Sequence, residues 1–363
     1  MLTVNELFSG IGAFRKALIN LNVPYQIVGI SEIDKFAIRS YEAMYGKTRN
    51  YGDISKIEKL DYADLWTYGF PCQDISQAGK QAGIIKGKTR SGLLYEVERL
   101  LKTSVESNES PKYLIMENVK ALVGKKFIDD FNRWICRLNE LGYDTYYAIM
   151  NAADYGIPQK RERVIAVSIR KDLHKQFEFP SPVPLKFSFY DALEEYPDSK
   201  YFLSNEMYKF CIERDQYCKS HNLGYRFTPV ARERELQDSE KLLQQEKDEE
   251  LKTTLSEKRC IQIATLYGKP KWKRESIARV YSPEGLCPTI VTSGGGLHEV
   301  KILDKSNVRR LTPKECFRLM GFSDSDYEKA HSVCSDTQLY KQAGNSIVVD
   351  VLEAVLKELL KDG

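Results

Sequence analysis

The sequence predicts an α/β fold with a second, smaller domain, and two observations lead to that prediction. Up to about residue 170, short β-rich runs alternate with segments whose apolar residues recur at helical spacing, which is typical of stacked β-α units around a parallel sheet. Residues 179–184 then contain three prolines, which neither a helix nor a central strand accommodates. We therefore expect a domain boundary near this segment.

The predicted elements follow one another without an internal repeat. Strands are expected at residues 3–8, 25–31, 64–68, 112–116, 143–150 and 164–169. Helices are expected at residues 12–21, 35–45, 92–101 and 127–141. Residues 231–258 have the pattern of one or two amphipathic helices, which we interpret as a solvated face. Near the end, Thr312-Pro313 opens a helix and residues 347–360 form a long amphipathic one.

Composition limits the possible classes of protein. The 363 residues are 42% hydrophobic, and no apolar run approaches the roughly 20 residues of a membrane span, so we expect a cytoplasmic protein that contacts no membrane. The eight cysteines include no C-x-x-C pair, and we expect no metal site. The net charge of +3 does not by itself indicate a nucleic-acid partner, although local basic clusters occur, one of them Arg309-Arg310.

Three polar or glycine-rich turns follow predicted strands. The first strand ends in Phe8-Ser9-Gly10-Ile11-Gly12, the second ends at Glu32 about 20 residues later, and Asp53 lies near the next turn. Nucleotide-binding α/β folds place an acid at this spacing against ribose hydroxyls. Carboxylates without a phosphate-binding lysine fit S-adenosylmethionine better than a polyphosphate. Alternatively, the glycines only permit the turn and Asp53 only caps a helix.

A candidate nucleophile lies after the strand at residues 64–68. Pro71 stiffens the approach to Cys72, and this position is at the sheet edge where open α/β folds carry out chemistry. Glu117 and Asn118 end the next strand, so a carboxyl group can meet the thiol. They could instead be a capping acid and a turn former. Arg161 and Arg163 alternate onto one side, which suits phosphate or a base carbonyl, although a surface salt bridge would also explain each.

These residues resemble the C5-cytosine DNA methyltransferase family across nearly the whole chain. Five motifs occur in the family's order: residues 8–12, Pro71-Cys72-Gln73, Glu117-Asn118-Val119, residues 159–163 and residues 342–346. The resemblance implies the Rossmann-like mixed sheet of S-adenosylmethionine-dependent methyltransferases, with a smaller target-recognition domain. It also implies that the last helix returns to the first domain. We therefore expect a catalytic domain of residues 1–185 plus 305–363, and a target-recognition domain of residues 186–304.

The resemblance also implies roles for particular residues. Those around S-adenosylmethionine would be Phe8, Gly10, Gly12, Glu32, Ile33, Asp53, Ile54, Pro71, Asn345 and Ser346. Those around the cytosine would be Cys72, Glu117, Asn118, Arg161 and Arg163. Those on DNA would be Gln73, Ser76, Arg90, Gln159, Arg279 and Thr289. The implied partner is double-stranded DNA, with the chain a monomer in the bacterial cytosol or nucleoid and a restriction endonuclease acting on the same sequence.

The expected mechanism makes opposite demands on two side chains. Cys72 must attack as a thiolate, so we predict that its pKa falls when DNA binds, aided by cations such as Arg163. Glu117 must donate a proton near neutral pH, so its pKa must be raised by burial. Two alternatives remain: a methyltransferase acting on cytosine in transfer RNA, and a catalytically silent DNA-binding module that retains the fold.

Overall fold

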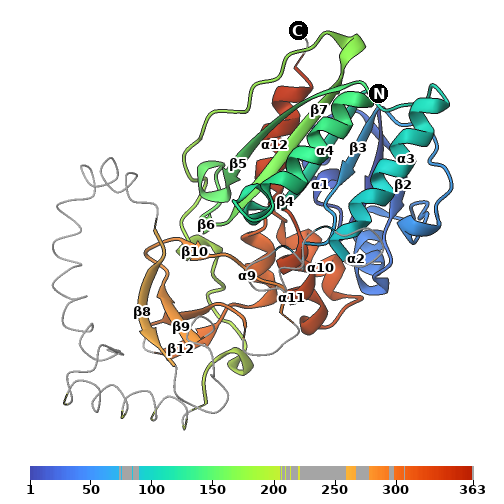
Figure 1. The fold of residues 1–363 in the computed structure, drawn as a ribbon. Coiled ribbons are helices and arrows are strands. Elements are labelled where there is room, and N and C mark those ends of the chain that lie inside the picture. The colour runs from blue at the N-terminus through green and yellow to red at the C-terminus, as the bar shows by residue number, and fades with distance from the viewer. Residues whose placement is uncertain are drawn as a thin grey trace.

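The computed structural model describes residues 1–72, 75, 84, 90–204, 206, 209, 213, 220, 259–266, 278–293, 298–305 and 307–361. In this part of the chain, a six-stranded sheet has the order β2-β1-β3-β4-β7-β5 (Figure 1). Its strands are β1 (Leu2–Leu7), β2 (Tyr25–Ser31), β3 (Leu65–Tyr68), β4 (Tyr113–Val119), β5 (Tyr143–Asn151) and β7 (Glu162–Arg170). All six coincide with predicted strands to within three residues at either end.

Helices cover both faces of this sheet. The predicted helices appear as α1 (Ala13–Asn20), α2 (Lys35–Tyr45), α3 (Leu94–Glu106), α4 (Ile128–Glu140), α9 (Pro313–Arg318) and α12 (Val349–Leu359). The helices α10 (Asp324–His331) and α11 (Asp336–Asn345) were not predicted from the sequence. Short 3-10 helices are η1 (Ile54–Lys56), η2 (Arg90–Leu93), η3 (Lys120–Val123), η4 (Ala152–Asp154), η5 (Lys171–Leu173), η6 (Tyr190–Ala192) and η7 (Ser199–Tyr201). The amphipathic segment predicted at 231–258 lies outside the described residues.

The sheet is mixed, so the parallel arrangement expected from the β-α alternation holds for only part of it. The strands β2, β1, β3 and β4 are parallel, whereas β7 runs antiparallel between β4 and β5. Only residues 152–161 join β5 to β7, and a connection of that length favours an antiparallel pair. The mixed sheet implied by the family resemblance is confirmed.

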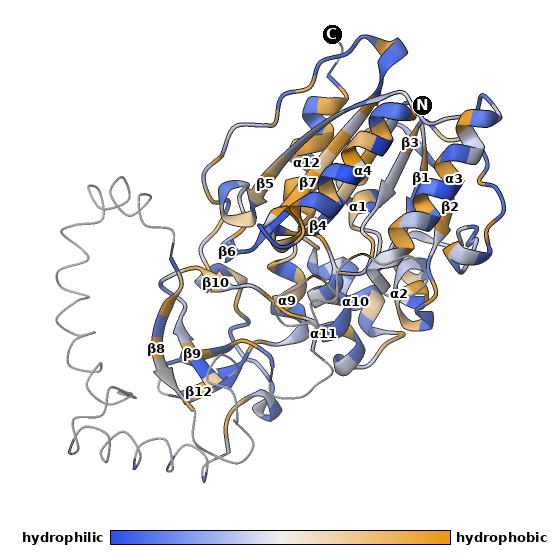
Figure 2. Ribbon diagram, viewed as in Figure 1, coloured by the Kyte–Doolittle hydropathy of each residue, from blue (hydrophilic) through white to orange (hydrophobic). Residues whose placement is uncertain are grey.

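Alternate residues of the central strands enter two hydrophobic cores, one on each face. On β3, Leu65 belongs to the core beneath α1 and α12, whereas Trp66 belongs to the core beneath α3 and α4. The period of two along each strand produces this division. Figure 2 shows the same pattern on α4, whose apolar side faces the sheet and whose polar side faces outward.

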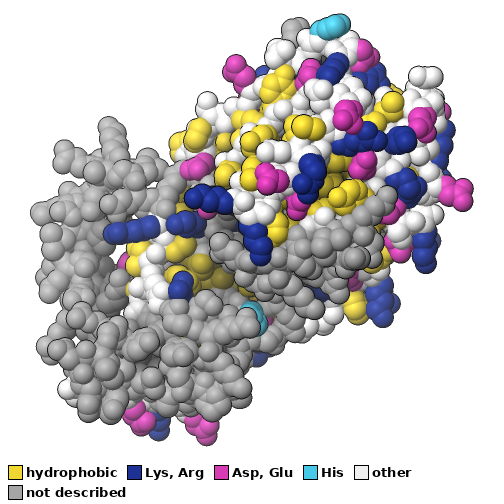
Figure 3. Space-filling view, viewed as in Figure 1, with side chains coloured by type: hydrophobic (Ala, Val, Ile, Leu, Met, Phe, Trp, Pro, Cys, Tyr) yellow, Lys and Arg dark blue, Asp and Glu magenta, His cyan; other side chains and the backbone are white. Residues whose placement is uncertain are grey.

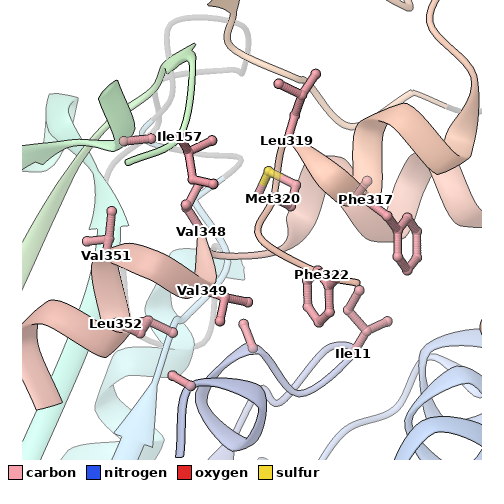
Figure 4. Close-up of a cluster of buried hydrophobic side chains, with 14 of the residues drawn as sticks. Ile11, Ile157, Phe317, Leu319, Met320, Phe322, Val348, Val349, Val351 and Leu352 are labelled. Atoms are coloured by element: carbon pink, nitrogen blue, oxygen red, sulfur yellow. The ribbon is translucent and has the colours of Figure 1, made fainter. Parts of the chain in front are cut away.

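The C-terminal elements close the first core. Helix α12 packs against α1, and Asn20 Nδ2 donates to Glu353 Oε1 at 2.6 Å between them. Figure 4 shows Ile11, from the turn after β1, beside Phe322. Thr312 caps α9 with Pro313 in its first turn, as predicted. Residues from both ends of the chain therefore build one core.

A second sheet, called the small sheet below, has four strands in the order β12-β11-β9-β8 in the described residues. It comprises β8 (Ile261–Thr265), β9 (Arg279–Ser282), β11 (Lys301–Asp304) and β12 (Asn307–Arg310), and the pair β10 (Cys287–Pro288) and β6 (Gln159–Lys160) links it to the first part of the chain. The strand β12 lies beyond residue 304, the expected end of the smaller domain. That division of the chain stays a prediction.

The expected basic cluster Arg309-Arg310 was wrong for its first member. The Arg309 side chain is fully buried and pairs with both oxygens of Glu315, at 2.9 and 2.8 Å, and with Asp304 at 2.5 Å. Since Glu315 also caps α9, these ion pairs join the small sheet to the C-terminal helices.

Neither a membrane span nor a metal centre is found in the described residues. No described helix combines the length and apolar character that a bilayer crossing needs. Within the same ranges, no three His, Cys, Asp or Glu side chains lie in a group that could hold a metal ion.

Candidate active site

The turn after β1 has a backbone that favours glycine. Gly10 and Gly12 have φ angles of 55° and 77°, and Phe8 also has a positive φ of 56°. A Cβ atom on Gly12 would lie 2.6 Å from Tyr41 Cε2 and 2.7 Å from Tyr45 Cε2, so only glycine fits. A Cβ atom on Gly10 would meet nothing within 4 Å. Gly12 is therefore required by the turn and its packing, and Gly10 leaves open space for a ligand.

Glu32 ties neighbouring turns together. Its Oε2 accepts from the backbone N–H of Gly10 at 2.9 Å, and its Oε1 accepts from Ile33 and Asp34 at 2.8 Å each. The backbone of Glu32 also exchanges hydrogen bonds with the side chain of Asn50. The turns at 8–12, 32–34 and 50–53 thus lie side by side at the carboxyl ends of β1 and β2.

The predicted cofactor residues just after β2 and at the start of η1 differ in exposure. Ile33 is 71% exposed, whereas Ile54 is buried. Asp53 accepts from the backbone and hydroxyl of Ser55 at 3.0 and 2.8 Å, and these hydrogen bonds lower the pKa of its carboxyl. Asp53 therefore caps η1, as the alternative interpretation proposed, and its carboxylate stays charged.

Helix α11 brings Asn345 and Ser346 toward the same edge of the sheet. Gln342 accepts from Ser40 Oγ at 2.9 Å and donates to Phe36 O at 3.0 Å, which fastens α11 to α2. Asn345 is exposed at the end of α11, and Ser346 is buried just after it.

The segment that carries Cys72 is held by the neighbouring strand. Asn118 Nδ2 donates to Phe70 O at 3.0 Å, and Ser91 Oγ donates to Pro71 O at 2.8 Å. Ser91 was not predicted, because a serine at the start of a helix carries no sequence signal of this contact. Hydrogen bonds therefore hold the carbonyl oxygens of Phe70 and Pro71, the two residues before Cys72.

Glu117 lies against this segment. A Cβ atom on Gly69 would lie 3.3 Å from Glu117 Oε2, so the carboxyl group touches the backbone three residues before Cys72. Its Oε1 lies 3.1 Å from Nε of Arg163. Burial raises the pKa of the Glu117 carboxyl, and Arg163 and Arg161 oppose that rise. The net effect favours the protonated form of this carboxyl group more than in an exposed glutamate.

Cys72 shares the same electrostatic environment. Burial, and then the Glu117 carboxylate, raise the pKa of its thiol, while Arg163 and Arg161 act to lower it. The cations expected to favour the thiolate are therefore present, but burial exceeds their effect in the chain without DNA. The predicted fall in the pKa of Cys72 on DNA binding stays a prediction.

Arg161 and Gln159 are buried inside the protein. Arg161 donates to the carbonyl oxygens of Ile290, Gly344 and Ser346 at 2.8, 3.1 and 2.7 Å. Gln159 donates to Leu319 O at 2.7 Å and accepts from the N–H of Ile290 at 3.0 Å. These contacts give both side chains a structural role between β6, the residue 290 segment and the C-terminal helices.

The predicted DNA residues are placed unevenly. Gln73 and Ser76 lie outside the described residues, and Arg90 is described only by its backbone at the start of η2. Arg279 is on β9, and Thr289 Oγ1 donates to Lys160 O at 2.6 Å. Figure 3 shows that basic and acidic side chains are interspersed over the described surface on the side of the molecule seen in Figure 1.

Solved structures identify the class of fold. A methyltransferase from Entamoeba histolytica, EhMeth, aligns with a TM-score of 0.66 at 15% identity, covering 100% of this chain and 99% of its own. The Dnmt2 methyltransferase of S. pombe aligns with a TM-score of 0.64 at 20% identity, covering 99% and 98%. The chain has the Rossmann-like fold of these methyltransferases.

Sequence similarity then identifies the family. The C-5 cytosine-specific DNA methylase family matches residues 2–361. The Type II methyltransferase M2.ScrFI of Lactococcus lactis subsp. cremoris is 34% identical over 99% of both chains. The Orphan methyltransferase M.SPBetaI of Bacillus phage SPbeta is 31% identical, over 99% of this chain and 97% of its own. The chain belongs to the C-5 cytosine-specific DNA methylase family and is a DNA cytosine-5 methyltransferase.

A buried acid supports the turn after β1. Glu6 is 1% exposed, its Oε2 accepts from Tyr41 at 2.5 Å, and its Oε1 accepts from the N–H of Arg15 at 3.0 Å. Tyr41 and Tyr45 pack on Gly12, and Tyr45 also donates to Gly12 O at 3.1 Å. Burial raises the pKa of Glu6 to about 7, and this effect exceeds the opposing effects of Tyr41 and Arg15.

This raised pKa predicts a pH-dependent stability. The folded chain holds the Glu6 proton up to about pH 7, whereas the unfolded chain loses it near pH 4.3. This stability is therefore fully present below about pH 4.3 and is lost as the pH rises from there through about 7, by at most about 4 kcal/mol. Urea unfolding of the wild type and Glu6→Gln from pH 5 to 8 should give free energies whose difference changes in this direction. A constant difference would contradict the prediction, and Glu58→Gln, at an exposed position, is the control.

Proposed function

We propose that the chain transfers a methyl group from S-adenosylmethionine to carbon 5 of a flipped-out cytosine in duplex DNA, through a covalent adduct with Cys72. The observation that carries this proposal is the Glu117 carboxyl group. It has a raised pKa, touches the backbone at Gly69 and pairs with Arg163, beside the segment that carries Cys72. This arrangement supplies a proton donor next to a nucleophile.

Carbon 5 of cytosine is a poor nucleophile, and the two side chains can activate it. The thiolate of Cys72 forms a bond to carbon 6 while Glu117 gives its proton to N3. The electron pair of the carbon 5–carbon 6 double bond becomes available at carbon 5 and forms the bond to the methyl group, while the bond between that methyl group and the donor sulfur breaks and its electrons stay on the donor sulfur. A base then removes the proton from carbon 5, the double bond re-forms, the Cys72 sulfur leaves carbon 6 as a thiolate, and N3 returns its proton to Glu117. Carbon 6 is out of reach in a stacked duplex, so the base must flip at a cost of roughly a few kcal/mol.

Several features of the turns fit S-adenosylmethionine, which supplies an electrophilic methyl group when bound. The open space beside Gly10 admits a ligand, and Ser9 Oγ is buried without a hydrogen-bond partner among the described residues. The exposed Ile33 side chain offers an apolar contact, and the charged Asp53 offers an acceptor. Phe8, Gly12, Glu32, Ile54, Pro71, Asn345 and Ser346 would complete the site. Of these, Ile54 would act by packing.

We propose that DNA lies between the two sheets and contacts Gln73, Ser76, Arg90, Arg279 and Thr289. The burial of Gln159 favours a structural role for this side chain over the DNA contact expected from the sequence. Arg161 would likewise hold the pocket, whereas Arg163 would face the cytosine. The proposed domains remain residues 1–185 plus 305–363 for catalysis and 186–304 for target recognition.

The relatives suggest a biological setting. One is called a type II methyltransferase and another an orphan methyltransferase of a phage. We propose a cytoplasmic monomer that methylates one specific sequence, as part of a restriction-modification system in which an endonuclease cuts the same sequence.

Trapping on modified DNA tests this function. Fluorine at carbon 5 blocks proton loss, so the full chain should form an adduct with 5-fluorocytosine duplex DNA that survives denaturation and requires S-adenosylmethionine. Absence of an adduct on DNA that contains its target, while the chain still binds that DNA, would favour the silent binding module. Methyl incorporation into transfer RNA but not into duplex DNA would favour the RNA alternative.

A further inference from the structure

Residues 288–292 form a strap that lies across β6 and the end of α11. Two contacts with β6 hold its first part: Thr289 Oγ1 donates to Lys160 O at 2.6 Å, and the N–H of Ile290 donates to Gln159 Oε1 at 3.0 Å. Arg161, from the same part of the chain, donates to Ile290 O at 2.8 Å. The strap leads from β10 toward β11 and thus belongs to the same stretch as the small sheet.

The strap then passes directly over α11. A Cβ atom on Gly344 would lie 2.5 Å from both C and O of Val291, so the two backbones touch and no side chain fits between them. Arg161 fixes the other side of this contact, since it also donates to Gly344 O and Ser346 O. The strap therefore has a defined position relative to Asn345, which lies between these two residues.

At the end of the strap, Thr292 Oγ1 donates to Asn345 Oδ1 at 2.5 Å. An asparagine amide has an accepting oxygen and a donating nitrogen, and its two orientations differ by exchange of these atoms. A hydroxyl that donates to the oxygen selects one orientation and leaves both N–H groups of Nδ2 available on the other side.

We propose that Thr292 is a positioning residue for S-adenosylmethionine, acting by fixing the amide of Asn345 so that Nδ2 donates to the cofactor. This inference rests on the proposed function, in which Asn345 contacts the cofactor. It goes further because it gives Thr292, a residue of the stretch proposed for target recognition, a part in cofactor binding. Thr292 itself does not contact the cofactor.

The test uses the full chain with Thr292→Val, which keeps the shape of the side chain and removes its hydroxyl. Calorimetric titration with S-adenosylmethionine, without DNA, should give a dissociation constant about 3- to 10-fold higher, the range for loss of one hydrogen bond. The KM for S-adenosylmethionine should rise similarly, with kcat at saturation changed less than about 2-fold. Thr292→Ser should restore the wild-type constant. Thr103→Val removes another threonine hydroxyl, on α3, and is the matched control.

A double-mutant cycle with Asn345→Ala separates the possible failures. If the wild type does not bind S-adenosylmethionine, the proposed function fails. If Asn345→Ala weakens binding but Thr292→Val does not, this inference alone is overturned. Binding by the double variant should equal that of Asn345→Ala. If Thr292→Val weakens S-adenosylmethionine binding as much in the Asn345→Ala background as in the wild type, Thr292 does not act through Asn345.

Discussion

Replacing Cys72 with alanine should lower kcat for DNA methylation by more than about 10³-fold, because the reaction would lose its nucleophile. Without a sulfur atom bonded to carbon 6, the proton on Glu117 cannot make carbon 5 reactive enough to take a methyl group. Methyl incorporation into duplex DNA, measured at saturating substrate, gives this ratio directly. DNA binding should persist, since Asn118 and Ser91 hold backbone atoms of the segment rather than the thiol.

Cys136 provides the matched control, because it is an exposed cysteine on α4. Cys136→Ala should retain wild-type kcat. Methylation by Cys72→Ala above about one-tenth of the wild-type rate would exclude a covalent mechanism at this residue.

In the free chain the pKa of Cys72 is raised, so alkylation of the thiol should be slow at neutral pH and should accelerate as the pH increases.

Replacing Arg309 with methionine should lower the free energy of unfolding by about 3–5 kcal/mol, the usual cost of leaving one charge of a buried pair unpaired. Arg309 and Glu315 are both fully buried and share two hydrogen bonds. Without the arginine, the hydrogen bonds that Glu315 retains among the described residues include those from the neutral N–H groups of Thr312 and Glu194. Denaturant unfolding of purified protein measures the loss.

The control for this prediction is Arg133→Met, which removes an exposed pair with Asp130 and should cost less than about 1 kcal/mol. The double variant Arg309→Met/Glu315→Gln should lose less stability than Arg309→Met, because position 315 then carries no buried charge. If the single variant is as stable as wild type, the buried network does not hold the small sheet to α9.

Local patterns in the sequence were sufficient for the elements of the large sheet. Helix α2 begins and ends as predicted, because Asp34 caps its first turn and Gly46 has a positive φ just after its end. The direction of β7 was not predicted, since periodicity reports which face of a strand is buried and not which neighbour it pairs with. Helix α11 was missed because its charged and polar residues obscure the three apolar side chains that it buries, Leu339, Tyr340 and Ala343.

For the candidate site, too, the sequence predicted some contacts and could not predict others. Cys72 and Glu117 could be placed together from the sequence, because the strands before them are neighbours in a sheet whose parallel strands end at one edge. The roles of Arg161 and Gln159 as buried links could not, since their partners at Ile290, Leu319 and Ser346 are more than 120 residues away. Only the packed tertiary structure reveals such contacts.

The pairing of α1 with α12 sets an order for biosynthesis. During translation, α1 emerges from the ribosome long before α12 exists, so the apolar residues that Ala17 and Leu18 later contact are still missing. The first half of the nascent polypeptide can assemble β1 to β4, yet part of the face that α1 covers stays exposed until the final helix is made. Chaperones that shield exposed apolar surface should therefore bind this face of the unfinished chain.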